Sequence, residues 1–192
     1  MSTRTRIAVL TIALLALPVL AACSAPAPTA DPTSAPVVVA DIAGEWDLTR
    51  TLSNTTVTNE GIAVGTVDMR AVMMSDVNCD DTGACTGTFI SARSFYAADQ
   101  SAATPAALTF DGTTLTVTFP TQPADCLNTD GSIGIAGAYE ITSTYTLTAD
   151  DADATGFTGT LASTVTTVGD AVGTGCAADG DRDFDVTMAR HN

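Results

Sequence analysis

After Asp41, apolar and polar residues alternate with a period of two along most of the chain. This alternation is typical of β-strands that bury one face, because successive side chains of a strand point to opposite sides. The clearest run is 137–148, where tyrosine, isoleucine and leucine alternate with threonine and glutamate. A helical period persists nowhere for more than about a turn. The pattern predicts eight strands, at residues 45–53, 64–75, 86–96, 106–110, 113–119, 137–148, 155–168 and 182–190.

Short polar segments separate these runs and indicate hairpin connections. Asp111-Gly112 has the composition of a tight turn, and residues 149–154 and 79–85 form two further loops between long alternating runs. Antiparallel strands joined mostly by short loops predict an all-β fold, an eight-stranded up-and-down barrel built from residues 41–192. A two-sheet β-sandwich of the same strands is the alternative, which the pattern alone does not separate from the barrel.

The N-terminal segment has the features of an export signal. Arg4 and Arg6 precede a mostly apolar run and small residues. The uncharged stretch 7–22 is shorter than the roughly 20 apolar residues that a membrane-spanning helix needs. We therefore expect residues 1–22 to be a cleaved signal peptide.

The residues around the expected cleavage point, Leu20-Ala21-Ala22-Cys23, resemble the lipobox of bacterial lipoproteins. The resemblance implies that Cys23 receives a diacylglyceryl group, becomes the first residue and is acylated, for example with palmitate. It also implies that the protein is held at the outer face of the bacterial cell membrane. An ordinary cleaved signal with an accidental cysteine is the alternative.

Residues 23–40 are rich in proline and alanine and show no periodicity, as in an extended linker between an anchor and a domain. Once the signal is removed, five arginines and no lysine stand against 22 acidic residues, a formal charge of −17. Nucleic-acid binding needs a basic surface, so this balance argues against it. Anionic lipid would repel such a chain, so membrane attachment is expected only through the lipid anchor.

Four cysteines remain after Cys23, and an even number in an exported domain predicts disulfides. Three pairings are possible. Loops of a meander alternate between its two ends, and this parity favours Cys79–Cys85 and Cys126–Cys176 over the crossed pairings. A zinc site is not expected, because the chain has no Cys-x-x-Cys and its one histidine is His191.

The residues needed for common catalytic sites are missing. A single histidine one residue from the end excludes a convincing Ser-His-Asp or Cys-His site, and no glycine-rich phosphate loop follows a strand. Asp179, Asp181 and Asp183 have the spacing of a calcium loop, but Phe184 and Arg190 stand where an EF-hand has glycine and glutamate. We expect these acids to be solvated and the protein to be non-catalytic, with no metal or cofactor.

Gly44-Glu45-Trp46 opens the first predicted strand and Arg190 ends the last. This arrangement resembles lipocalins and related calycin barrels, in which a G-x-W motif starts the barrel and a late arginine packs over the tryptophan. The resemblance implies that Trp46 and Arg190 close one end of the barrel through a cation–π contact. The alternative is that Trp46 is an ordinary core residue.

A barrel of this size can hold one small apolar molecule. The residues predicted to line such a cavity are Val67, Met69, Met73, Tyr145 and Leu161. The sequence therefore favours a lipid-anchored, non-catalytic protein that binds a small apolar ligand. The alternative is a structural or interaction protein of the cell envelope with a filled core and a protein partner that the sequence does not identify.

Overall fold

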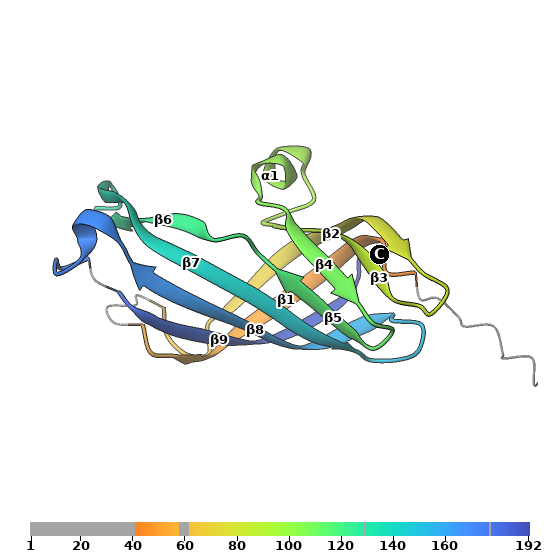
Figure 1. Cartoon of the computed structure of the whole chain (residues 1–192). Coiled ribbons are helices and arrows are strands. Elements are labelled where there is room, and N and C mark those ends of the chain that lie inside the picture. The colour runs from red at the N-terminus through yellow and green to blue at the C-terminus, as the bar shows by residue number, and fades with distance from the viewer. Residues whose placement is uncertain (1–40, 58–61, 129, 177) are drawn as a thin grey trace, which may run out of the picture. The chain divides into compact units, whose positions relative to one another are not determined.

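The computed structural model describes residues 41–57, 62–128, 130–176 and 178–192 (Figure 1). Within these ranges the chain forms nine strands, one short α-helix and one 3₁₀ turn. The strands are β1 (Gly44–Thr55), β2 (Val67–Cys79), β3 (Cys85–Ala92), β4 (Ala106–Phe110), β5 (Thr114–Thr118), β6 (Gln122–Leu127), β7 (Ile133–Ala149), β8 (Gly156–Thr167) and β9 (Gly180–Arg190). The helical elements are α1 (Ala97–Ala102) and η1 (Gly169–Ala171).

The strands form a closed antiparallel barrel. Neighbouring strands pair in sequence order, and β1 pairs with β9 from Trp46↔Arg190 to Thr55↔Arg182, which closes the barrel. β5 and β6 occupy a single position along the edge of β7: β5 pairs with residues 144–148 and β6 with residues 133–141. Nine strands therefore fill eight positions. The predicted eight-stranded up-and-down barrel is confirmed, and the sandwich alternative is wrong.

The barrel wall has two unequal sides. β3, β4 and β5 are short, whereas β7 runs for 17 residues and continues past them with β6 and β8 (Figure 1). The predicted strand 86–96 ends at Ala92, and the connection from β3 to β4 contains α1, which lies outside the strands at the top of Figure 1. We call the end near Trp46 the closed end. The open end is the one at which β1 ends and β2 begins.

Apolar side chains fill the closed half of the barrel. The core contains Trp46 and Phe157, whose ring centroids are 5.4 Å apart in an edge arrangement, and Phe110 also packs edge-on with Phe157, with centroids 5.9 Å apart. Fully burying a large apolar side chain contributes about 1.5–3 kcal/mol. The fold therefore gains most of its hydrophobic stabilisation in this half, where the buried residues include Ile42, Leu48, Val72, Met74, Leu108, Leu115, Val117, Leu147, Val186 and Met188.

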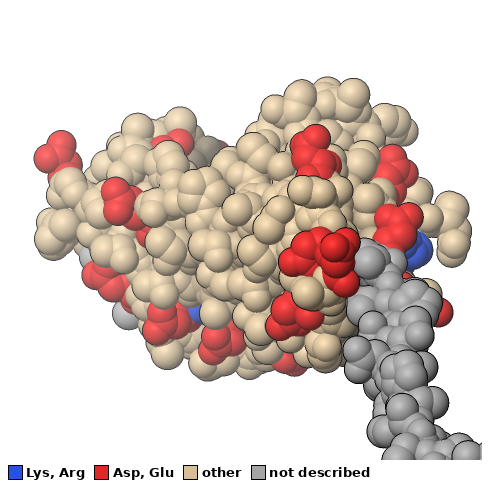
Figure 2. All heavy atoms as spheres, turned by 45° about the vertical axis from the view of Figure 1, so that its right-hand side comes forward, with Lys and Arg blue, Asp and Glu red and all other residues tan. Residues whose placement is uncertain are grey.

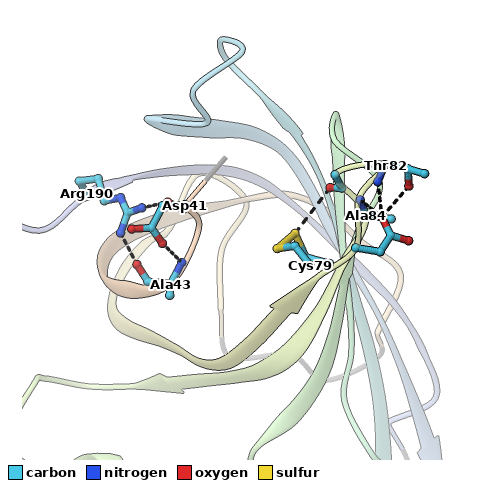
Figure 3. Close-up of a disulfide and its surroundings, with 9 residues drawn as sticks. Asp41, Ala43, Cys79, Thr82, Ala84 and Arg190 are labelled. Atoms are coloured by element: carbon cyan, nitrogen blue, oxygen red, sulfur yellow. Dashed lines mark hydrogen bonds between the residues drawn. A yellow bond between two sulfur atoms is a disulfide. The ribbon is translucent and has the colours of Figure 1, made fainter. Parts of the chain in front are cut away.

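Arg190 covers the core at the closed end. Its guanidinium carbon lies 4.2 Å from the Trp46 ring centroid, and the guanidinium donates hydrogen bonds to the carbonyls of Asp41 and Ala43 (Figure 3). Trp46 Nε1 donates to the Ile42 carbonyl at 3.1 Å. A Cβ atom on Gly44 would lie 3.1 Å from Arg190 Nη1, and the φ of +114° at this residue favours glycine. The Gly44–Trp46 motif and Arg190 thus form one packed unit at this end.

The disulfides are Cys79–Cys85 and Cys126–Cys176, the pairing that loop parity favours. Cys79–Cys85 joins the end of β2 to the start of β3 at the closed end (Figure 3). Cys126 lies within β6 rather than in a loop, and its bridge reaches the connection between β8 and β9. This second bridge therefore ties the β6–β7 hairpin to a segment 50 residues away in sequence.

Candidate ligand site in the open half of the barrel

The strand register places charged residues, not apolar ones, inside the open half. Val72 and Met74 of β2 are buried in the core, so the residues that share their face are Asp68 and Arg70. Val67 is 58% exposed and Met69 71% exposed, and Met73 shares their outer face. The prediction that Met69 and Met73 line the interior is wrong, whereas Val67 faces outward but is among the residues that line one cavity of the open half. It followed the apolar residues of β2, and in the open half of this strand the apolar residues face outward.

Tyr145 and Leu161 are buried and face the interior, opposite each other in the β7–β8 register. Both line a cavity of about 300 Å³. A second cavity of about 510 Å³ adjoins the first, because Arg50, Arg70, Gln122 and Ser143 line both. Val67 lines the second cavity together with Ile62 and Thr66. The arginines therefore lie where the two cavities meet.

Arg50 and Arg70 converge on one carboxylate oxygen. Arg50 lies opposite Asp68 in the β1–β2 register, and its Nη2 and Nε donate to Asp68 Oδ2 at 2.6 and 2.8 Å. Arg70 Nε donates to the same oxygen at 2.9 Å. The arginine side chains are 23% and 26% exposed, so the pair is sheltered but open to solvent. Such charge-assisted bonds are shorter and stronger than bonds between neutral groups.

Polar and aromatic groups surround the arginine pair. Arg50 lies over the Phe184 ring at 5.1 Å, and the Ser143 and Ser163 hydroxyls share a hydrogen bond of 2.8 Å. Arg182, on β9, lies opposite Ser163 and lines the larger cavity. The cavity wall thus combines cationic and hydroxyl groups with apolar surface, which Ile141, Phe184, Phe119 and Leu161 provide.

The arginines and burial together set the protonation states in the cavity. Partial burial raises the pKa of Asp68, but the hydrogen bonds and charges of Arg50 and Arg70 outweigh it and hold that pKa below its ordinary value of 3.8. Burial raises the pKa of the Tyr145 hydroxyl, against the opposing effect of Arg50, Arg70 and Ser91. Near neutral pH Asp68 is therefore ionised and Tyr145 is neutral.

The charge of the cavity is opposite to that of the rest of the molecule. The whole chain carries a formal charge of −15, yet three arginines and only one acid line the two cavities among the described residues. Figure 2 shows acidic side chains scattered over the face on which the closed end comes forward, with little basic surface. The arginine cluster was not predicted from the sequence. The signal was present, because Arg50 lies two residues from Leu48 and from Leu52 and so shares their inward face.

The structure does not assemble the remaining candidates into a site. Asp179 Oδ1 accepts a hydrogen bond from the Thr167 amide at 2.6 Å, Asp181 Oδ1 one from the Thr164 hydroxyl at 2.7 Å, and Asp183 Oδ2 one from the Asn54 amide at 3.1 Å. The described ranges contain no group of three His, Cys, Asp or Glu side chains that could hold a metal ion. Cys23 and the linker 23–40 lie outside the described residues. None of the helices within the described ranges is long and apolar enough to cross a membrane.

Comparisons with known proteins give a structural likeness without a family. No protein-family model matches the sequence, and no curated protein matches it. Among solved structures, the monomer form of the M. tuberculosis PknI sensor domain is similar, with a TM-score of 0.45 and 10% sequence identity. The match covers 79% of this chain and 88% of that one. At this distance nothing about function follows from the likeness.

Proposed function

We propose that this protein is a non-catalytic binding module, lipid-anchored through Cys23 at the outer face of a bacterial membrane, whose barrel binds a small amphipathic anion. The observation that carries the proposal is the convergence of Arg50 and Arg70 between two cavities in a strongly acidic chain. Guanidinium groups bind carboxylates, sulfates and phosphates through paired N–H donors. The ligand expected from the sequence was apolar. Because charged and polar groups line the cavity, we propose instead an anion that has an apolar part.

Stability alone gives no reason for this cluster. Charged groups lose solvation when they enter a barrel, and an apolar core of the same volume is often at least as stable. The contacts with Asp68 use two nitrogens of Arg50 and one of Arg70, and a guanidinium has five N–H donors in all. The pair can therefore hold a second anion beside Asp68.

The cavity also supports the apolar part of the ligand. Ile141 and Phe184 line the larger cavity, and Phe119 and Leu161 line the smaller one. An alkyl chain or ring placed against these side chains would leave water, which contributes about 25 cal/mol per Å² of apolar surface buried. An anionic head at the arginines and an apolar body along these walls would use both features of the site.

Two observations support the extracytoplasmic location. The N-terminal segment has the form of a lipoprotein signal, and both disulfides join cysteines of the barrel. Disulfides of this kind persist in oxidising compartments.

The proposal involves no reaction. The described lining of the two cavities contains no histidine or cysteine that could serve as a base or nucleophile.

Isothermal titration of the purified protein with decanoate and with decanol tests the proposal. These probes share an alkyl chain and differ in the head group. We expect decanoate to bind at least tenfold more tightly, because a charge-assisted hydrogen bond contributes about 1.5–3 kcal/mol. Arg70→Gln should remove most of that advantage, whereas Arg93→Gln, an exposed arginine that lines neither cavity, should not. Equal affinity for the two probes would refute the proposal. So would failure of decanoate, decyl sulfate and decyl phosphate alike to bind.

A second candidate function is contact with a protein of the cell envelope. Large apolar side chains are exposed on the segments that lead to and from the open end: Ile62, Val64, Val67, Leu127, Ile133 and Val172. Exposed apolar groups of this kind occur at interaction surfaces. Replacing Leu127 and Ile133 together by serine should abolish partner capture without changing decanoate binding. If this double variant bound decanoate more weakly and still captured the partner, the ligand-binding function would be favoured.

A further inference from the structure

Asp68 occupies the position between the two arginines that a bound anion would also seek. The β1–β2 register places Asp68 opposite Arg50, and Arg70 lies two residues further along β2 on the same inward face. Three nitrogens from the two side chains lie within 2.9 Å of its Oδ2. Asp68 is thus a counterion built into the site, on strand β2 of the barrel wall.

We propose that Asp68 determines which anion the cavity accepts, by limiting it to ligands with a single negative charge on the head group. The inference rests on the proposed function and names the ligand class: amphiphiles with a carboxylate or sulfate head, rather than a phosphate monoester. Two guanidinium charges and one carboxylate charge leave a net +1 around Oδ2. A monoanionic head neutralises this charge. A dianionic head leaves one charge without a counterion in a partly desolvated site.

The other groups of the site do not alter this charge count at Oδ2. Asp68 is the only acidic residue among the described residues that line either cavity. Tyr145 is neutral, and Ser91, Ser143 and Ser163 carry no charge. Arg182 lines the larger cavity, but the cations that act on the pKa of Asp68 are Arg50 and Arg70. The selectivity between mono- and dianions should therefore respond to Asp68 in particular.

The experiment compares decyl sulfate with decyl phosphate by isothermal titration at pH 7.5. Both heads are tetrahedral and carry the same chain. The sulfate has one negative charge, and the phosphate is mostly dianionic because its second pKa is about 6. We expect the unmodified protein to bind decyl sulfate more tightly. Asp68→Asn keeps the shape of the side chain and removes its charge, so it should shift the ratio of the two dissociation constants about tenfold towards the phosphate.

Asp185→Asn is the matched control. It removes one negative charge from the outer face of β9 and lies outside both cavities, so it should change the ratio less than about twofold. A ratio that stays the same in Asp68→Asn, or that moves equally in both variants, would overturn the inference. In that case binding of decanoate over decanol would still uphold the proposed function. If Asp68→Asn does not fold, the unmodified protein still decides, because equal or tighter binding of the phosphate is then the refuting result.

Discussion

Removing the Cys126–Cys176 bridge should destabilise the barrel more than removing Cys79–Cys85. In the chain-entropy model a disulfide stabilises by restricting the unfolded chain, and the effect grows with the number of residues it encloses. The two bridges span 50 and 6 residues. The same relation gives about 4 kcal/mol for the longer bridge and about 2 kcal/mol for the shorter one.

Side-chain packing makes the expected losses of stability for the two bridges more similar, but the longer bridge still contributes more. Cys85 is buried in the core, so its truncation to alanine adds a loss of about 1 kcal/mol, the value of one methylene-sized group. Cys126 and Cys176 are only half-buried, and their bridge lies outside the core cluster. We therefore expect a loss of about 4 kcal/mol in Cys126→Ala/Cys176→Ala and about 3 kcal/mol in Cys79→Ala/Cys85→Ala.

Urea denaturation followed by tryptophan fluorescence measures both losses. Trp46 is the only tryptophan, and it is fully buried next to Phe157, so its emission reports on the closed half of the barrel. The dependence of unfolding free energy on urea should also become steeper without the long bridge, because the unfolded chain then exposes more surface. The reasoning is refuted if the short bridge proves the more stabilising, or if loss of the long bridge costs less than about 1 kcal/mol.

Five further substitutions test separate parts of the protein. Gly159→Ala should cost roughly 1–3 kcal/mol in urea denaturation, because its Cβ would lie 2.2 Å from the Thr146 carbonyl oxygen. Gly175→Ala has open space at the same atom and should be neutral, and equal losses would contradict the packing argument. Arg190→Met should lower stability by about 2 kcal/mol, since it removes the cation–π contact and two hydrogen bonds, and an unchanged melting curve would count against a closing role. The lowered pKa of Asp68 means that its ionised form stabilises the fold above pH 3.8 and that this contribution is lost as pH falls through the lower folded value, so Asp68→Asn should have a flatter acid limb than the unmodified protein. Parallel acid limbs would exclude this linkage. Cys23→Ala should move the protein from the membrane fraction to the soluble fraction of cells, whereas continued membrane association would exclude the lipid anchor.

Alternation predicted the strands well wherever one face of a strand is uniformly apolar. Residues 106–110 are a strand with the bounds expected, and the predicted run 155–168 corresponds to β8, Gly156–Thr167. β6 was missed because Gln122–Leu127 contains Pro123 and Asp125 and shows no alternation. It is a strand because it pairs with the first half of β7, and the bridge at Cys126 ties it to the β8–β9 connection. Pairing of this kind depends on tertiary context that local propensity does not record.

The candidate site escaped prediction for a related reason. Periodicity identifies the inner face of a strand by its apolar residues, and β2 changes character halfway along. Val72 and Met74 face the core, whereas the same face carries Asp68 and Arg70 in the open half. Counting in steps of two from the buried Val72 identifies the inward face of β2 correctly. Counting in steps of two from Val67 and Met69 identifies the outward face instead.

The change of character along β2 marks the boundary between two halves of the barrel with different roles. In the closed half, Trp46, Phe110 and Phe157 fill the interior and a guanidinium covers it, so this half supplies hydrophobic stabilisation. In the open half the same strands carry arginine, aspartate and serine, which lower the hydrophobic gain. Because the hydrophobic core of this small barrel is limited to the closed half, the strands of the open half need other contacts to hold their positions. The closing β1–β9 pairing and the Cys126–Cys176 bridge both fix strands that continue into the open half, where the bridge anchors β6 beside β7. Loss of that bridge should therefore weaken decanoate binding even under conditions in which the closed half stays folded.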